Sequence, residues 1–155
     1  MQRVSAGQSF CSGRHLCKKM KIRNIIAGIL CLLTGCAIYL LLRSDTIRLY
    51  RWVKATVGTA ALDSLRETTL GWDIPEFVRF SLPDGLWCAA YVLIADGIWG
   101  NERGLIKHII VSFIPAVAIG HECLQLLGLA RGTFDPSDLL CYAFPLAVYF
   151  FRTMR

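Results

Sequence analysis

Charged side chains are scarce in this sequence: Asp, Glu, Lys and Arg make up 18% of its 155 residues, whereas 55% are hydrophobic. A soluble domain of this length interleaves its charges more evenly along the chain. Here the charges form blocks, and the long stretches between the blocks hold few or none. This pattern argues against an ordinary water-soluble domain and indicates an integral membrane protein.

The sequence also lacks the motifs of the common enzyme classes. It contains no nucleophile elbow, phosphate-binding loop, dinucleotide fingerprint or zinc-binding spacing. Most of the seven cysteines fall in apolar stretches, where a thiol packs as a small apolar group. Cys11, His15 and Cys17 offer three metal ligands but no fourth. We therefore predict no metal site and no cofactor, and the sequence favours a protein that is not an enzyme.

Four apolar stretches have the length that crossing a membrane requires or come close to it. A helix rises about 1.5 Å per residue, so about 20 residues cross a hydrocarbon core of about 30 Å. The alternating pattern of a barrel strand is missing. We predict an all-α membrane protein, in which a flexible basic arm at residues 1–21 precedes a single domain, 22–155, that contains a bundle of about four transmembrane helices. The predicted spans are 22–42, 83–100, 105–129 and 138–151.

The first span has a competing interpretation. Residues 33–36 read Leu-Thr-Gly-Cys and resemble a bacterial lipoprotein cleavage box, for which translation would start at Met20 rather than Met1. However, the apolar run continues from Ala37 to Leu42 and is too long for the core of a signal peptide. We therefore favour an uncleaved helix.

Orientation follows from the basic residues beside the spans. Lys and Arg cluster before the first span and recur near residues 103–107 and at the C-terminus, with Glu102 as the acid among them. The positive-inside rule then places both termini in the cytoplasm, in a bacterial inner membrane. This topology also accounts for the net charge of +6 without nucleic acid as a partner.

The segment between spans one and two has an amphipathic pattern. Arg48, Arg51 and Arg66 fall mostly away from its apolar positions. We predict an amphipathic helix on the outer membrane surface, weakened at Gly58. The apolar residues that recur at helical spacing are Ile47, Tyr50, Val53, Val57, Ala61 and Leu65.

Span three carries the least ordinary residues, His121, Glu122 and Gln125, after a long apolar run. An ionisable group inside a span is costly unless it is paired, so it faces the bundle or water rather than lipid. Glu122 and Gln125 share one helical face, whereas His121 points about 100° away. The simpler interpretation of His121 is a polar side chain packed between helices.

Asp96 is the other acid inside a predicted span, and Trp99 marks the inner membrane boundary close to it. An acid at that depth is stabilised by a cation within reach. We therefore expect Asp96 to pair with Arg103 or Lys107, which is a structural role.

Two segments at the outer interface have the pattern of helix starts, Ser81 to Asp84 and Asp135 to Asp138. In each, a capping residue is followed three positions later by an acid, with proline in the first turn. Capping alone explains Ser81 and Asp135. Asp84 and Asp138 have two open interpretations, because an acid at this depth also faces the neighbouring helices.

The run Glu122-x-x-Gln125, followed by Arg131 and by Asp138 in the last span, resembles the VanZ-like integral membrane family. That family is marked in its C-terminal half by E-x-x-Q, an arginine and an aspartate, and the resemblance covers about half of the chain. Asp84 is in place in span two, but the lysine and histidine usual in the family are missing. Tyr142 stands where the family has asparagine. The resemblance implies a divergent member that acts at the bacterial cell envelope.

The family takes its name from a protein associated with low-level glycopeptide resistance, so the resemblance implies an accessory or resistance-type role. We rank three hypotheses: an outward-facing polar cluster that binds an envelope ligand, a cluster that only locks the helices together, and an intramembrane enzyme with Glu122 as acid or base. Besides the lipid bilayer, the candidate partners are a lipid headgroup, an envelope peptide or a glycopeptide. We expect Arg131 to pair with Glu122 or Asp138. The candidate residues are Glu122, Gln125, Arg131, Asp138 and Asp84, with His121 and Tyr142 as weaker candidates.

Overall fold

Every element of secondary structure in the described part of the chain is a helix. The computed structural model describes the backbone of residues 6–43, 48–57, 59–69, 72–100, 102 and 104–154, and their side chains except those of residues 6–20, 48–50, 54, 57, 59–62 and 65. The all-α prediction is confirmed. The helices are α1 (Ala6–Leu42), α2 (Arg48–Val57), α3 (Thr59–Thr69), α4 (Glu76–Trp99), α5 (Leu105–Leu126) and α6 (Pro136–Met154).

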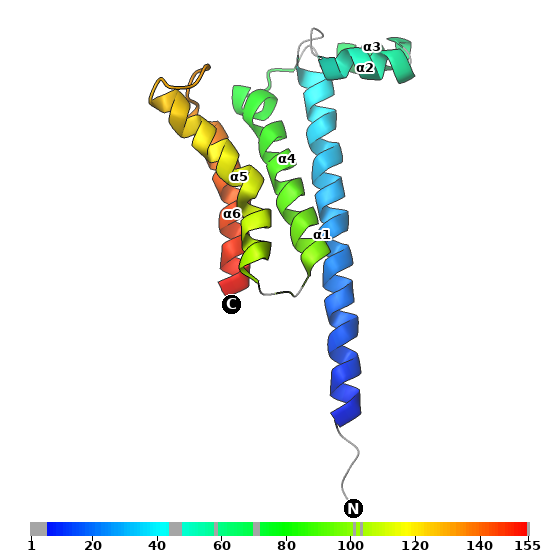
Figure 1. Ribbon diagram of the computed structural model, residues 1–155. Coiled ribbons are helices and arrows are strands. Elements are labelled where there is room, and N and C mark those ends of the chain that lie inside the picture. Colours follow the sequence, from blue (N-terminus) through cyan, green and yellow to red (C-terminus); the bar gives the residue numbers. More distant parts are fainter. Residues whose placement is uncertain are drawn as a thin grey trace, which may run out of the picture.

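Helices α1, α4, α5 and α6 run alternately up and down beside one another, and α2 and α3 lie across one end of α1 (Figure 1). Helix α4 is central, because it packs against α1 on one side and against α5 and α6 on the other. We call the end that carries α2, α3 and the α5–α6 connection the upper end. The lower end carries the α4–α5 connection and the C-terminus, and the N-terminal part of α1 extends beyond it (Figure 1).

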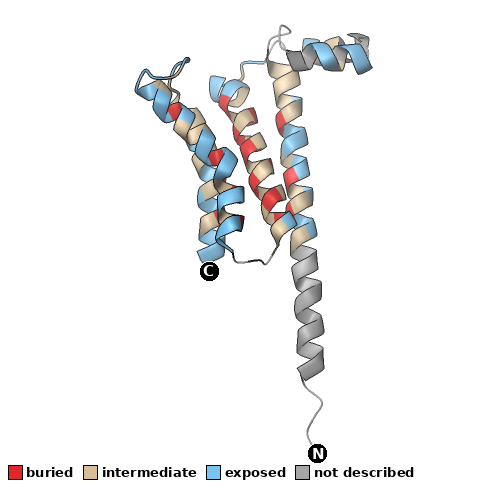
Figure 2. Cartoon of the chain, in the orientation of Figure 1, coloured by how far each residue is buried: buried red, intermediate tan, exposed pale blue. Residues whose placement is uncertain are grey.

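Three helices are long and apolar enough to cross a membrane: α1 over Lys21–Leu42, α4, and α5. Their outward faces carry large apolar side chains, such as Leu30 at 59% and Phe113 at 58% exposure. Figure 2 shows buried residues concentrated on α4 and exposed ones on the outer faces of the other helices. Apolar faces of this extent fit contact with lipid rather than water.

Small residues set the close contact between α1 and α4. A Cβ on Gly28 would lie 2.6 Å from Cγ1 of Ile94, and a Cβ on Gly35 would lie 2.8 Å from Nε1 of Trp87. Transmembrane helices associate through such small residues, because these let the backbones approach closely. Any larger side chain at Gly28 or Gly35 would push the helices apart.

Helix α4 begins at Glu76, directly after Pro75, so the helix start predicted at Ser81 to Asp84 is wrong. Ser81 is therefore not a cap; it lies within the helix and is 1% exposed. Pro83 lies inside the helix as well, where it donates no hydrogen bond to the preceding turn. Transmembrane helices tolerate such a proline because neighbouring helices compensate for the lost bond.

Helices α5 and α6 match their predictions more closely. Helix α5 ends at Leu126 instead of residue 129, because Gly128 adopts a φ of 69° and forms a Schellman turn. In that turn the N–H of Leu129 donates to the carbonyl of Leu124 at 2.9 Å. Helix α6 begins at Pro136 and ends at Met154, so it is longer at both ends than the predicted 138–151.

Helix α1 begins at Ala6, so the chain is helical through most of the arm that we expected to be flexible. Extending a helix costs far less than nucleating one, and the first span supplies the nucleus. The predicted interfacial segment contains two helices, α2 and α3, rather than one. Gly58, between them, lies outside the described residues, as do most of the side chains on the apolar face. Hydrogen bonds join α3 to the end of α1: Arg66 donates to the carbonyl of Arg43 at 2.6 Å, and Thr69 to that of Leu41 at 3.3 Å.

Candidate functional site

The upper end brings together acidic residues from three helices. Asp84 lies on α4, Glu122 on α5, and Asp138 and Tyr142 on α6. All three carboxyl groups lie within electrostatic range of the Tyr142 hydroxyl. Together with Gln125 we call these residues the upper cluster. Residues that lie as far apart in sequence as Asp84 and Asp138 therefore come close enough to interact electrostatically.

Glu122 is 5% exposed and belongs to a hydrogen-bonded chain. Its Oε2 accepts a bond from the backbone N–H of Asp135 at 3.4 Å. The Gln125 amide is oriented so that its nitrogen faces acceptors. The nitrogen donates to Glu122 Oε2 and to the carbonyl of Thr133, both at 3.1 Å. The amide oxygen lies 3.2 Å from Nδ1 of His121. Glu122 and Gln125 therefore connect the end of α5 to the segment that leads into α6.

The connection between α5 and α6 is shaped by glycine. Gly132 adopts a φ of 126°, and a Cβ at this position would lie 2.5 Å from the end of the Gln125 side chain. The backbone conformation favours glycine, and a larger side chain here would displace the Gln125 amide. The loop can therefore close over Gln125, which holds this side chain against Glu122.

Asp135 caps α6 as predicted: its Oδ1 accepts the N–H of Ser137 at 2.8 Å. In a complete capping box, Asp138 would also accept the backbone N–H of Asp135. That N–H donates to Glu122 instead. Oδ1 of Asp138 is consequently buried without a hydrogen-bond partner. Such an atom costs about 1–3 kcal/mol, so native proteins contain few of them.

A second buried atom without a partner lies in the same α4–α6 contact. The hydroxyl of Ser81 has no hydrogen-bond partner. Ser81 and Gly85 are four residues apart on one face of α4. That face meets α6, because a Cβ on Gly85 would lie 2.7 Å from Cβ of Cys141, which is one turn after Asp138. Ser81 and Asp138 therefore belong to the same level of the same helix contact.

Arg131 does not take the role that we expected. Its side chain is exposed, and it forms no ion pair with any described residue, so the expected pairing with Glu122 or Asp138 is wrong. The physical reason is the loop, in which the Gln125 amide occupies the position beside Glu122. His121 is exposed too, rather than packed between helices, although its Nδ1 contacts Gln125.

The cation within electrostatic range of Asp84 is Arg43, at the upper end of α1. Its guanidinium lies 5.0 Å from the ring centre of Tyr39 and 5.6 Å from that of Phe80. Aromatic rings attract a cation in this geometry. No sequence pattern points to Arg43, because only the packing of α1 against α4 brings it near Asp84.

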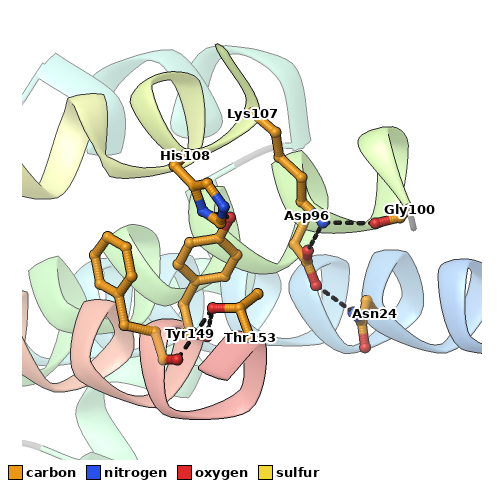
Figure 3. A network of polar contacts seen from close by, with 8 residues as sticks. Asn24, Asp96, Gly100, Lys107, His108, Tyr149 and Thr153 are labelled. Carbon is orange, nitrogen blue, oxygen red and sulfur yellow. Dashed lines mark hydrogen bonds and ion pairs between the residues drawn. The ribbon is translucent and has the colours of Figure 1, made fainter. Parts of the chain in front are cut away.

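A second polar network occupies the lower end of the bundle (Figure 3). Nζ of Lys107 lies 2.6 Å from Oδ1 of Asp96, and the Asn24 amide donates to Oδ2 of Asp96 at 2.8 Å. Lys107 also donates to the carbonyl of Gly100. The expected pair of Asp96 with Lys107 is confirmed, while Arg103, the alternative partner, lies outside the described residues. The network joins α1, α4 and α5.

The lower network continues to α6 through an aromatic pair. The Tyr149 hydroxyl lies 2.8 Å from Nδ1 of His108, and the Thr153 hydroxyl donates to the Tyr149 carbonyl at 2.9 Å (Figure 3). We call these residues, together with Asn24, Asp96 and Lys107, the lower network. Both oxygens of Asp96 have partners, in contrast to Asp138 at the upper end.

Among the described residues, no group of three or more His, Cys, Asp and Glu side chains is arranged to hold a metal ion. The chain matches no protein-family model, no curated protein and no solved structure.

Proposed function

We propose that this protein is a VanZ-like integral membrane protein of the bacterial cell envelope, whose upper cluster binds an envelope ligand in an accessory or resistance-type role. The order of Glu122, Gln125, Arg131 and Asp138 along the last two long helices supports the family assignment. At the upper end of the bundle Glu122 is buried, Gln125 donates to Glu122, and Oδ1 of Asp138 is buried. Their position at one end supports a common site.

In this proposal α6 is the fourth membrane span. Its 19 residues give a length of about 28 Å, close to the thickness of a hydrocarbon core. Helix α6 also packs along α4 and α5, which are long and apolar enough to cross a membrane. Both the C-terminus and the N-terminal part of α1 lie toward the lower end, as an even number of spans requires (Figure 1).

The upper end faces the outside of the cell in this proposal. The basic residues that precede the Lys21–Leu42 span of α1 and follow α4 support a cytoplasmic lower end. Helices α2 and α3 then lie on the outer membrane surface, across the end of α1 (Figure 1). Trp52 of α2 is 78% exposed, as an aromatic residue that enters the headgroup region would be.

One observation carries the ligand-binding function: Oδ1 of Asp138 is buried without a partner. If the upper cluster only locked the helices together, its acids would be satisfied by protein groups, as Asp96 is in the lower network. A ligand that donates a hydrogen bond to Asp138 completes the upper cluster. Catalysis by Glu122 has less support, because Glu122 Oε2 is already engaged by Gln125 and by the Asp135 N–H.

The test is Asp138→Asn, with Asp73→Asn as the matched control. Asp73 is an exposed acid shortly before α4, so the control removes the same charge near the same end. Each variant is expressed in a bacterial strain that lacks the wild-type gene, and glycopeptide tolerance is compared at equal amounts of membrane protein. We expect Asp138→Asn to lose the phenotype and Asp73→Asn to keep it.

Two results would contradict this proposal in different ways. If cells with Asp138→Asn tolerate glycopeptide as well as the wild type does, at a normal amount of membrane protein, the proposed ligand-binding function is wrong. Loss of Asp138→Asn protein from the membrane would show that Asp138 is needed for folding, and would favour the structural alternative.

A further inference from the structure

We infer that the upper cluster recognises a primary ammonium group, held between α4 and α6 by Ser81, Asp84 and Asp138. The inference rests on the proposed ligand-binding function and names the chemical class of its ligand. Two observations point to a ligand here: Ser81 is 1% exposed with an unpartnered hydroxyl, and Oδ1 of Asp138 is buried without a partner.

The unpartnered atoms define which chemistry fits. A carboxylate only accepts hydrogen bonds, and a serine hydroxyl both accepts and donates one. Ser81 and Asp138 lie at one level of the α4–α6 contact, and Asp84 lies within electrostatic range of Asp138. An ammonium group has three donors and no acceptor, so its donors match the acceptor oxygens that Ser81, Asp84 and Asp138 offer.

The charge balance favours a cation as well. Asp84, Glu122 and Asp138 all lie within electrostatic range of the Tyr142 hydroxyl, and Arg43 lies within range of Asp84. The Arg43 guanidinium also lies over two aromatic rings on the α1 side of α4. Carboxylates at the edge of a membrane are costly without neutralisation. A cation bound on the α6 side of α4 would supply it.

Other cations fit less well. A quaternary ammonium group has no N–H donor and is recognised by the faces of aromatic rings rather than by single oxygens. It would leave Ser81 and Asp138 without a donor. The described residues also contain no group of three side chains arranged for a metal ion. The ammonium group can come from a phosphatidylethanolamine headgroup or from a soluble amine, and the experiment separates these sources.

The experiment measures Tm of the full-length protein in vesicles of three compositions: phosphatidylglycerol alone, with phosphatidylethanolamine, or with phosphatidylcholine. The choline headgroup is the matched control, because its methyl groups replace the three N–H donors. We expect phosphatidylethanolamine, or else soluble ethanolamine added to the choline vesicles, to raise Tm by roughly 5 °C. Phosphatidylcholine itself should leave Tm unchanged.

Ser81→Ala and Asp138→Asn locate the effect. Ser81→Ala removes an unpartnered buried hydroxyl, and Asp138→Asn removes the charge of an unpartnered buried carboxylate. Without amine, the Tm of each variant should therefore equal or exceed that of the wild type. The increase in Tm that the amine causes should be lost in both. Asp73→Asn, the exposed control, should keep that increase. If Asp138→Asn does not fold, Ser81→Ala still tests the site, because alanine only removes a hydroxyl.

An increase caused by the lipid alone supports a headgroup ligand, and one caused by ethanolamine supports a soluble amine. An equal increase with phosphatidylcholine, no increase with either amine, or an increase that persists in Ser81→Ala overturns the inference. If amines have no effect but Asp138→Asn still abolishes glycopeptide tolerance, the ligand is not an ammonium group and the proposed binding function stands. If tolerance is unaffected as well, both proposals fall.

Discussion

The buried pair of Lys107 and Asp96 leads to a quantitative prediction about stability. Lys107 is 4% exposed, and its Nζ lies 2.6 Å from the carboxylate that also binds Asn24. Lys107→Met keeps most of the side-chain volume but leaves the charge of Asp96 uncompensated between the helices. Removing one member of a buried ion pair costs about 3–5 kcal/mol. For a chain of this size, this cost lowers Tm by roughly 6–20 °C.

The double variant Asp96→Leu with Lys107→Met should be more stable than Lys107→Met alone. Replacing a whole buried pair by apolar side chains is often close to neutral. Here it also removes the acceptor of the Asn24 amide, which costs about 1–3 kcal/mol. We therefore expect the two substitutions to be strongly non-additive, with a coupling free energy of about 2 kcal/mol or more.

The assay is thermal unfolding in lipid vesicles, or unfolding by SDS in mixed micelles, on the wild type, both single variants and the double variant. The prediction requires that the double variant unfold at a higher temperature than Lys107→Met. A cost below about 1 kcal/mol for Lys107→Met, typical of an exposed ion pair, would refute the reasoning. Additive effects of the two substitutions would refute it too.

Two more predictions concern packing and topology. Gly28→Ala places a Cβ 2.6 Å from Ile94 and should lower the free energy of unfolding by about 1–3 kcal/mol in the same assay. In the control Gly120→Ala the added Cβ has nothing within 4 Å, so the free energy of unfolding should stay the same or rise by about 0.5–1 kcal/mol. Equal effects would mean that α1 does not pack closely on α4. A single cysteine at position 17 should resist an impermeant thiol reagent in intact cells, and one introduced at Trp52 should react; the reverse pattern would overturn the proposed orientation.

The sequence predicts the long helices well because hydrophobic length is a strong constraint. Helix α5 begins at Leu105 as expected, and the part of α1 that can cross a membrane ends at Leu42. The start of α4 was missed, because Ser81 and Pro83 have the local pattern of a helix N-terminus. Packing overrode that pattern: Ser81 is buried within α4, and the helix extends upward to Pro75.

The contacts between helices could be predicted only in part. Grouping Glu122 and Asp138 at one end follows from the lengths of the predicted spans, which place both residues near the same end. The Asp135 N–H donates to Glu122 rather than to Asp138. This hydrogen bond depends on the loop conformation at Gly132, which a hydrophobic pattern does not predict. Likewise, Asn24 bonds to Asp96 across 72 positions of sequence, and that register is decided by side-chain packing.

In the proposed function, the lower network supplies stability and the upper cluster binds the ligand. In the lower network the ion pair of Asp96 and Lys107 ties α4 to α5, and the bond between His108 and Tyr149 ties α5 to α6. These contacts hold α4, α5 and α6 together at the lower end of the bundle. A binding site needs such support, because its groups must be held in place before the ligand arrives. The cost of leaving Asp138 unpartnered is therefore tolerable in a bundle that the lower network already holds together.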